Sequence, residues 1–173
     1  MGSIRPLIES DDRRNFESGD VHLDRFFRLY AGQNQFRHHV SVTYVFENGG
    51  QILGYVTVSG GEITADRLPR GSKKFPRYPL PILRVGRLAV ARAARGMGIG
   101  AQMLRHGLSL AVSMAATTGC VGVLVDPKAG AEGFYQRFGF EPVQVLEGEI
   151  LAGSSYVSQF IPLAKIQAAL SAS

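Results

Sequence analysis

The sequence predicts an α/β domain in which a mixed β-sheet of six to seven strands is flanked by about four helices. β-branched and aromatic runs alternate with helix-periodic segments in the order βαββ, loop, βαβαββ. A buried apolar run, a glycine-rich turn and a long amphipathic helix follow one another in mid-chain, and such a strand–helix–strand unit must be parallel and right-handed. The length of 173 residues suits one hydrophobic core. Residues 1–173 are therefore expected to form a single domain.

The first elements are a short strand and a helix. Residues 4–8 are expected to form an edge strand. Asp20 is a plausible N-cap, because a carboxylate there accepts from free amides of the first helical turn. The helix after it carries apolar residues at helical spacing: Leu23, Phe26, Phe27 and Tyr30.

A β-hairpin and a loop come next. Residues 40–46 and 52–59 are rich in β-branched and aromatic residues and flank the turn 47–50, which ends in two glycines. Residues 60–81 contain four prolines and are expected to form an extended basic loop, because proline fixes φ and lacks an amide donor.

The second half begins with a buried strand over 82–90, in which Gly86 suggests a bulge. A long helix follows over 99–114, and Gly119 soon after stops it. The remaining elements are a strand over 120–125, a short helix over 131–138, and strands over 140–146 and 155–163.

Composition excludes several classes of protein. Hydrophobic residues make up 45% and charged residues 19%, which is an ordinary globular mixture. The single cysteine, Cys120, excludes a disulfide framework and a multi-cysteine metal site, and no metal is expected. The first ten residues lack the apolar core of a secretion signal, and no run approaches a membrane span. A cytoplasmic location is expected.

Positive charge is concentrated in the middle of the chain. The net charge is +5, yet residues 67–125 contain no Asp or Glu. This segment favours an anionic ligand, with phosphates or nucleic acid ahead of a merely solvated basic loop. Its basic residues are Arg67, Arg70, Lys73, Lys74, Arg77, Arg84, Arg87, Arg92, Arg95 and Arg105.

A glycine-rich loop, 95–100, lies between the buried strand and the long helix. Glycines allow positive φ and close approach, and the amides of a helix N-terminus attract a pyrophosphate. The Lys and Ser/Thr of a nucleotide triphosphatase loop are missing after Gly100, and no acid for a dinucleotide ribose appears before Asp126. A tight turn without a ligand is the simplest alternative.

The motifs around this loop resemble the GNAT family of N-acetyltransferases. They are Gly86-Arg87-Leu88-Ala89-Val90, then Arg95-x-x-Gly98-x-Gly100, then Phe134-Tyr135-Gln136-Arg137-Phe138-Gly139-Phe140. The resemblance implies the GNAT fold with a core acetyl-CoA motif over about 82–145, a strand bulge at Gly86 and Arg87, and acetyl-CoA as co-substrate. The residues that it assigns to coenzyme binding are Leu88, Ala89, Val90, Arg95, Gly96, Met97, Gly98, Ile99, Gly100 and Ala101.

Tyr135 occupies the position that serves as general acid in many members of that family. A phenol within hydrogen-bond reach can protonate the departing thiolate; the alternative role is packing beside Phe134, Phe138 and Phe140. Main-chain amides near Leu88 and Ala89 could stabilise the oxyanion. No base or nucleophile is assigned. Asp126 is expected to orient Tyr135 or a substrate amine, or to cap a loop, and Cys120 to be buried. The histidines His22, His38, His39 and His106 are expected on the surface or on helices.

A narrower resemblance, to the GNAT toxins of bacterial toxin–antitoxin modules, spans nearly the whole chain. It implies acetylation of the α-amino group of aminoacyl-tRNA, a ribbon–helix–helix antitoxin and a homodimer. It is carried by Phe16-Glu17-Ser18-Gly19, Leu23-Asp24-Arg25-Phe26-Phe27, Ala31-Gly32-Gln33-Asn34-Gln35, Thr43-Tyr44-Val45, Arg77-Tyr78-Pro79-Leu80-Pro81 and Val85-Gly86-Arg87-Leu88-Ala89-Val90.

A tRNA substrate requires basic side chains that contact phosphates. The candidates are Arg37, Lys73, Lys74, Arg77, Arg84 and Arg87, although Arg87 could instead pair with an acid. Two other functions stay open: acetylation of a small-molecule or peptide amine, and a non-catalytic module that binds coenzyme A or RNA.

Overall fold

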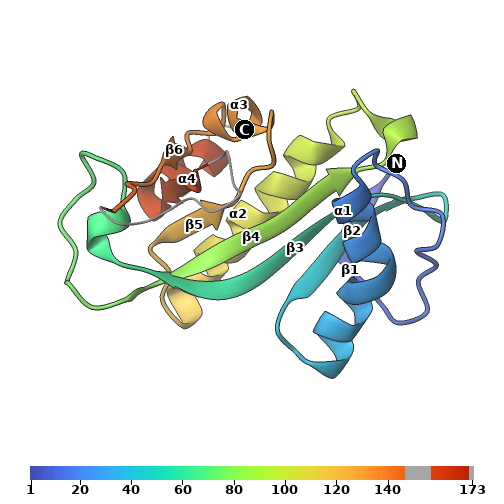
Figure 1. Ribbon diagram of the computed structural model, residues 1–173, viewed down its shortest axis with the longest axis horizontal. Helices are drawn as coiled ribbons and strands as arrows, with labels where there is room; N and C mark the ends of the chain where they lie inside the picture. Colours follow the sequence, from blue (N-terminus) through green and yellow to red (C-terminus); the bar gives the residue numbers. More distant parts are fainter. Residues whose placement is uncertain (147–156, 172–173) are drawn as a thin grey trace. The chain divides into compact units, whose positions relative to one another are not determined.

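The computed structural model describes residues 1–146 and 157–171 (Figure 1). Short 3-10 turns at Ala65–Arg67 and Arg92–Ala94 join the regular elements. The strands are β1 Ser3–Pro6, β2 Val42–Asn48, β3 Gln51–Ile63, β4 Leu80–Val90, β5 Gly122–Val125, β6 Glu141–Pro142 and β7 Gln159–Pro162. The helices are α1 Val21–Arg25, α2 Ile99–Thr117, α3 Glu132–Gln136 and α4 Leu163–Ser171, with π-helical turns η1 Phe26–Tyr30 and η2 Gln33–Arg37.

The strands of the described residues form one seven-stranded sheet in the order β1-β2-β3-β4-β5-β7-β6. β1 to β3 are antiparallel neighbours, and β7 pairs antiparallel with both β5 and β6. The prediction of a mixed sheet of six to seven strands with about four helices is confirmed. Two compact units divide the chain: a first unit, 1–59 and 85–107, and a second unit, 60–84 and 108–173.

An aromatic cluster forms the core of the first unit. The rings of Tyr55 and Phe27 stack with centroids 4.5 Å apart, and Phe16 meets both rings edge-on. The Tyr55 hydroxyl donates to the Leu23 carbonyl oxygen over 2.6 Å. Burial raises the pKa of Tyr55, so the phenol stays neutral. This cluster attaches the helical segment to β3.

The helical segment begins as the sequence predicts. The Asp20 carboxylate accepts from the amides of His22 and Leu23 at 3.0 and 3.1 Å. After one α-helical turn the backbone changes to π-type hydrogen bonding, in which the His38 amide donates to the Gln33 carbonyl oxygen over 2.9 Å. Hydrophobic periodicity did not indicate this change, because both helix types present Phe26 and Phe27 to the core.

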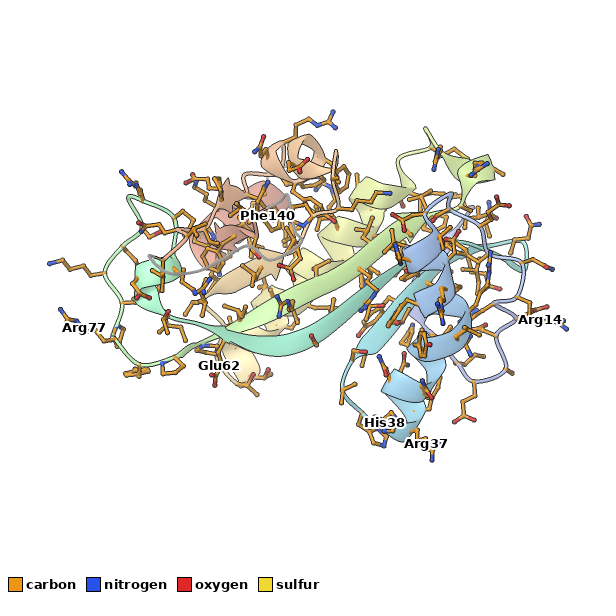
Figure 2. All side chains as sticks on the ribbon, in the orientation of Figure 1. Arg14, Arg37, His38, Glu62, Arg77 and Phe140 are labelled. Atoms are coloured by element: carbon orange, nitrogen blue, oxygen red, sulfur yellow. The ribbon has the colours of Figure 1, made fainter. Side chains whose placement is uncertain are left out.

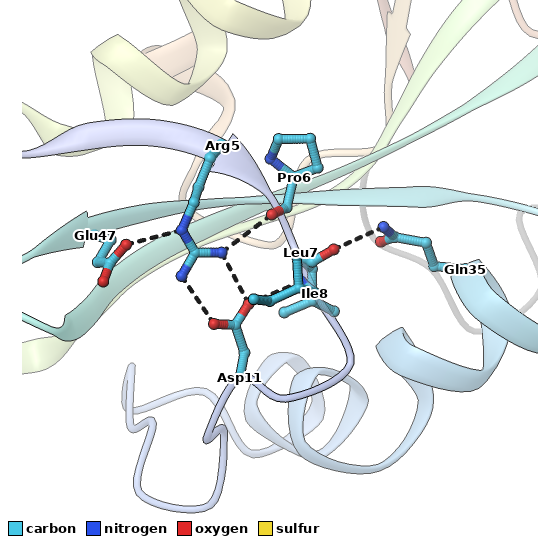
Figure 3. Close-up of polar contacts among 7 residues, drawn as sticks. All are labelled: Arg5, Pro6, Leu7, Ile8, Asp11, Gln35 and Glu47. Carbon is cyan, nitrogen blue, oxygen red and sulfur yellow. Dashed lines mark hydrogen bonds and ion pairs between the residues drawn. The ribbon is translucent and has the colours of Figure 1, made fainter.

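Strand β1 is held at the sheet edge by side-chain bonds (Figure 3). Arg5 donates to Glu47 over 2.8 Å and to both oxygens of Asp11 over 2.8 and 2.9 Å. The hydrogen bond from Arg5 lowers the pKa of Asp11. Gln35 bridges the Leu7 carbonyl oxygen and the Thr43 amide. These bonds satisfy polar groups where the strand ladder ends.

The core of the second unit is apolar and includes Ile82, Leu124 and Phe160. Two backbone hydrogen bonds tie β5 to its neighbours: the Val121 amide donates to the Pro81 carbonyl oxygen, and the Leu163 amide to the Val121 carbonyl oxygen. Cys120 is 6% exposed, as expected, and its thiol donates to the Gly122 carbonyl oxygen. Within the described ranges, no helix is both long and apolar enough to cross a membrane.

Most predicted elements differ from the structure by a few residues at their ends, and three differ more. The loop predicted over 60–81 is shorter, because β3 continues to Ile63 and β4 begins at Leu80. The strand predicted over 140–146 is only Glu141–Pro142, since the Gln144 amide bonds to the Arg67 carbonyl oxygen instead of a strand. The last strand begins at Gln159, and residues 155–156 of the prediction lie outside the described residues.

The last helix, α4, was missed by sequence reasoning. Its alanine, leucine, lysine and glutamine residues have high helix propensity, and this was the available signal. Only Ile166 is buried, so the segment lacks the broad apolar stripe that identifies α2.

Candidate active site

The glycine-rich loop leads directly into α2. Gly96 and Gly98 adopt φ values of +81° and +77°, and no atom of the described residues lies within 4 Å of the place where a Cβ would stand on either residue. The first helical bond runs from the Gln102 amide to the Gly98 carbonyl oxygen over 3.2 Å. The amides at the start of α2, from Ile99 to Ala101, therefore have no acceptor within the helix and can bind an anion.

Within the loop the side chains divide into two groups. Met97 is 61% exposed, whereas Ile99 is 2% exposed and packs near Gly54 and Met103. Gly100 and Ala101 belong to the first turn of α2. The loop therefore offers main-chain amides and open space to a ligand, while Ile99 anchors the helix to β3.

The Arg95 guanidinium does not point freely into the loop. It donates a short hydrogen bond to the Ser18 carbonyl oxygen, on the segment before α1. The Arg92 amide likewise donates to the Glu17 carbonyl oxygen over 2.8 Å. The resemblance assigned Arg95 to the pyrophosphate, but its side chain joins the loop to Ser18 of the same unit.

A buried carboxylate, that of Asp24, also holds the segment that contains Ser18. Asp24, 5% exposed, accepts from the Ser18 amide at 3.0 Å and from its hydroxyl at 2.5 Å. A buried carboxylate requires such donors, because desolvation without them is costly. Sequence reasoning used the motif containing Ser18 and Asp24 only as a family signature and missed this connection to the loop.

The end of β4 precedes the loop. Ala89 is buried against the aromatic core of the first unit, whereas Leu88 and Val90 are half-buried. The Ala91 amide donates to the Leu53 carbonyl oxygen over 2.8 Å, which fixes the exit of the chain toward the glycine loop. The bulge at Gly86 and Arg87 stays a prediction.

Tyr135 lies on α3 in the second unit and is 7% exposed. Its ring meets Phe134 and Phe140 edge-on, at centroid distances of 5.1 and 5.7 Å. Burial raises the pKa of Tyr135 to about 12. In the described part of the chain no group hydrogen-bonds its hydroxyl. The phenol is therefore neutral and keeps its proton available for donation.

Asp126 hydrogen-bonds two side chains of the second unit and not Tyr135. Its carboxylate accepts from the Arg84 guanidinium at 2.6 and 3.0 Å and from the Ser158 hydroxyl. Arg84, an expected RNA contact, is consequently engaged in an ion pair within the second unit.

Arg87 also has a defined environment. Its guanidinium carbon lies 3.9 Å from the centroid of the Phe26 ring, a cation–π contact. No acid pairs with Arg87 in the part of the chain that the structure describes, so the alternative of an ion pair is not observed. The side chain stays exposed on β4.

The other expected RNA contacts are on the surface. Arg37 projects from the end of η2, and Arg77 projects from the loop before β4 (Figure 2). Lys73 and Lys74 are exposed on the same loop as Arg77. That loop borders a pocket of about 750 Å³ in the second unit, whose described lining includes Arg70, Lys73, Lys74 and Arg77 together with Asp66.

The histidines lie where the sequence places them. His22, His38 and His39 are exposed, and His106 is half-buried on α2. The centroid of the His106 ring is 4.4 Å from that of Tyr44, and its Nε2 atom has no hydrogen-bond partner among the described residues. Burial lowers its pKa. Among the described residues no three His, Cys, Asp or Glu side chains are grouped so as to hold a metal ion.

Comparison with known proteins identifies the class. The acetyltransferase (GNAT) domain profile matches residues 39–142, more than half of the chain. The chain therefore belongs to the GNAT acetyltransferase family, as its glycine loop and flanking motifs predict. This match confirms the predicted enzyme class.

Within this family, the chain is similar to several individual proteins. The chain is 31% identical over 138 residues to the tRNA-acetylating toxin of Mycobacterium tuberculosis (strain ATCC 25618 / H37Rv), covering 79% of this chain and 82% of the relative. It is similar to AtaT complexed with acetyl-methionyl-tRNAfMet, with a TM-score of 0.84, 27% identity and coverage of 98% and 99% of the two chains. AtaTR bound with AcCoA matches with a TM-score of 0.79, 27% identity and 98% coverage of each chain.

Proposed function

We propose that this protein transfers the acetyl group of acetyl-CoA to the α-amino group of aminoacyl-tRNA and thereby acts as a translation-blocking toxin. The observation that carries the proposal is the 31% identity with a tRNA-acetylating toxin over 138 residues. The likeness to AtaT, whose structure contains acetyl-methionyl-tRNAfMet, supports the same substrate class.

The coenzyme is assigned to the glycine loop. The amides of residues 96–101 bind the pyrophosphate, helped by the partial positive charge at the N-terminus of α2. Main-chain groups of Leu88, Ala89 and Val90 bind the pantetheine arm and polarise the thioester carbonyl. Arg95 contributes through its backbone, because its guanidinium holds Ser18.

The reaction needs a neutral amine and a proton for the departing thiolate. The amine attacks the thioester carbonyl, and the tetrahedral intermediate collapses as its carbon–sulfur bond breaks. Tyr135 donates its phenolic proton to that sulfur, the attacking nitrogen releases its extra proton to water, and the phenolate regains a proton from solvent. An aminoacyl ester lowers the basicity of its amine below the pKa of roughly 7.7 to 8.0 of a peptide terminus, so no dedicated base is assigned.

RNA phosphates are assigned to exposed basic side chains. Arg37, Lys73, Lys74 and Arg77 have accessible charges, and among the described residues that line the pocket beside residues 70–77 there are four basic side chains and one acid. Arg84 and Arg87 are weaker candidates, because one is paired with Asp126 and the other is stacked on Phe26.

The proposal includes the partners and setting of such a toxin: a ribbon–helix–helix antitoxin, a homodimer, a single acetyltransferase domain over residues 1–173 and a cytoplasmic location. One neighbour is a toxin bound to the C-terminus of the antitoxin AtaR, and at 24% identity that likeness supports the fold only. An adjacent gene for a small ribbon–helix–helix protein would support the antitoxin assignment.

The decisive experiment is acetylation of a total charged tRNA pool with labelled acetyl-CoA, followed by identification of the modified amino acid. Label is expected on the amino acid attached to tRNA, and Tyr135→Phe is expected to abolish most of it. Equal labelling of free amines or peptides would contradict the tRNA assignment. Binding of acetyl-CoA without any turnover would instead favour a non-catalytic module.

A further inference from the structure

A second basic pocket lies in the first unit, outside the residues assigned to RNA above. It has a volume of about 670 Å³ and is lined by residues of α1 and η1 and of the segment before them. Three arginines, Arg25, Arg28 and Arg92, face two carboxylates, Glu17 and Asp24. Positive charge is therefore in excess among the described residues that line the pocket.

Gly19 allows the arginines to converge at the wall of this pocket. Its φ is +96°, and a Cβ there would stand 2.8 Å from Nη2 of Arg92 and 3.0 Å from Nη2 of Arg95. Any side chain at this position would displace the two guanidinium groups. Both guanidinium groups therefore lie against the Gly19 backbone, and two like charges near one point favour an anion close by.

The two carboxylates neutralise this charge incompletely. Oε1 of Glu17 is 3.7 Å from Nη2 of Arg92, too far for a hydrogen bond. Both oxygens of Asp24 accept from Ser18 instead of from an arginine. The pocket therefore keeps guanidinium donors available to a ligand.

The remaining arginines differ in how they are held. The Arg28 guanidinium donates a short hydrogen bond to the Phe16 carbonyl oxygen, which orients it. Arg25 is exposed and has no ion-pair partner in the part of the chain that the structure describes. Arg28 thus has a structural role as well, and Arg25 is the side chain that tests ligand binding most directly.

We infer that this pocket binds a phosphate of the RNA backbone near the acceptor end of the substrate. The inference rests on the proposed tRNA substrate. The planar guanidinium fork matches phosphate oxygens and forms charge-assisted hydrogen bonds. Val21 and Leu29, 75% and 59% exposed at the same pocket, offer apolar contact to a ribose or base.

The position of the pocket along the chain supports this ligand. Arg92 lines the pocket, and the glycine loop begins three residues later at Arg95, which itself approaches Gly19. The acetylated amine is attached to the 3′ end of the RNA, so the phosphates closest to that end must lie near the coenzyme. A basic pocket beside the coenzyme loop meets this requirement.

The test compares Arg25→Ala with Arg14→Ala as a matched control. Arg14 is exposed in the same unit, where it pairs with Asp12 at 3.0 Å. Each of the two variants removes one exposed positive charge from this unit. Binding of fluorescent deacylated tRNA is measured over a series of salt concentrations, together with KM for charged tRNA and for acetyl-CoA. Arg25→Lys tests whether charge alone is sufficient.

Arg25→Ala is expected to weaken tRNA binding about tenfold, the effect of one lost charge-assisted hydrogen bond. The slope of the logarithm of the tRNA association constant against the logarithm of salt concentration is expected to fall in magnitude by about 0.7 to 0.9. The tRNA affinity of Arg14→Ala is expected to stay within about twofold of wild type, and so is the KM of both alanine variants for acetyl-CoA. Arg25→Lys is expected to restore tRNA binding in part.

Three results separate this inference from the proposed function. If wild type binds and acetylates charged tRNA while Arg25→Ala behaves as Arg14→Ala does, the pocket assignment alone is overturned. If Arg25→Ala raises the KM for acetyl-CoA and leaves tRNA binding unchanged, the assignment to RNA is overturned, and the pocket binds a phosphate of the coenzyme instead. If wild type neither binds nor acetylates tRNA, the proposed function fails, and this inference fails with it.

Discussion

The first unit fixes its functional segment with hydrogen bonds to main-chain groups, whereas the second unit surrounds its functional tyrosine with aromatic rings. Ser18 is bonded by Asp24 through its amide and hydroxyl, and by Arg95 through its carbonyl oxygen. Tyr135 instead packs against Phe134 and Phe140, and no described group bonds its hydroxyl.

This difference matters for what a mutation reveals. Removing one member of the hydrogen-bonded network leaves buried donors without acceptors, so stability and ligand binding change together. Removing the Tyr135 hydroxyl leaves the aromatic packing intact, so chemistry is separated from folding. The predictions below test this contrast, from the largest expected effect to the smallest.

Tyr135→Phe is expected to lower kcat by about a hundredfold or more, the usual loss when a general acid is removed. Affinity for acetyl-CoA is expected to stay within about twofold of wild type, because the coenzyme is assigned to main-chain amides. Steady-state kinetics and calorimetric titration measure the two quantities. Tyr44→Phe is the control, since the Tyr44 ring packs against His106. A Tyr135→Phe enzyme with the wild-type rate would remove the phenol from the mechanism.

Asp24→Ala is expected to destabilise the protein by about 2 to 3 kcal/mol, because the Ser18 amide and hydroxyl lose their acceptor. Affinity for acetyl-CoA should also fall, since Ser18 holds Arg95 next to the loop. Urea unfolding and coenzyme titration measure the two effects. The exposed Asp12→Ala is the control. Loss of stability without any loss of coenzyme affinity would show that the Ser18 segment does not support the loop.

Alkaline pH tests the burial of Tyr135. Its folded pKa is about 12, above the value of about 10 in an unfolded chain. The stabilising contribution is therefore fully present below pH 10 and is lost as pH rises from about 10 to 12. Over that range wild type is expected to lose about 2 to 3 kcal/mol more than Tyr135→Phe. If the free energy of unfolding of wild type and of Tyr135→Phe changes by the same amount between pH 10 and 12, the aromatic burial of the phenol is contradicted.

A pair of glycine substitutions gives the smallest effects, and they have opposite signs. Gly98→Ala meets no atoms but forces a side chain onto φ +77°, at a cost of about 1 to 2 kcal/mol and with weaker acetyl-CoA binding. Gly133→Ala, in α3 and also without close neighbours, is expected to stabilise by up to about 1 kcal/mol. Thermal unfolding measures both. Equal effects would mean that the loop glycine is not required for its backbone conformation.

Much of the fold could be predicted from local patterns. The Asp20 cap, the hairpin around Gly49 and Gly50, and the start of α2 at Ile99 agree with the structure. Each depends on residues only a few positions apart, where propensity and capping act directly. The predicted boundaries of β3, β6 and β7 were wrong, because strand length depends on partners distant in sequence.

Of the candidate site, the sequence itself determined the glycine loop and the basic, acid-free middle of the chain. Glycine spacing and charge are properties of the chain alone, and so is the likeness to a family. The tertiary structure decided which partners the charged side chains take. In the folded chain Arg95 hydrogen-bonds Ser18, Arg84 pairs with Asp126, and Arg87 contacts the Phe26 ring. A long side chain bonds to whichever group folding brings within about 3 Å of it, and no local pattern specifies that group.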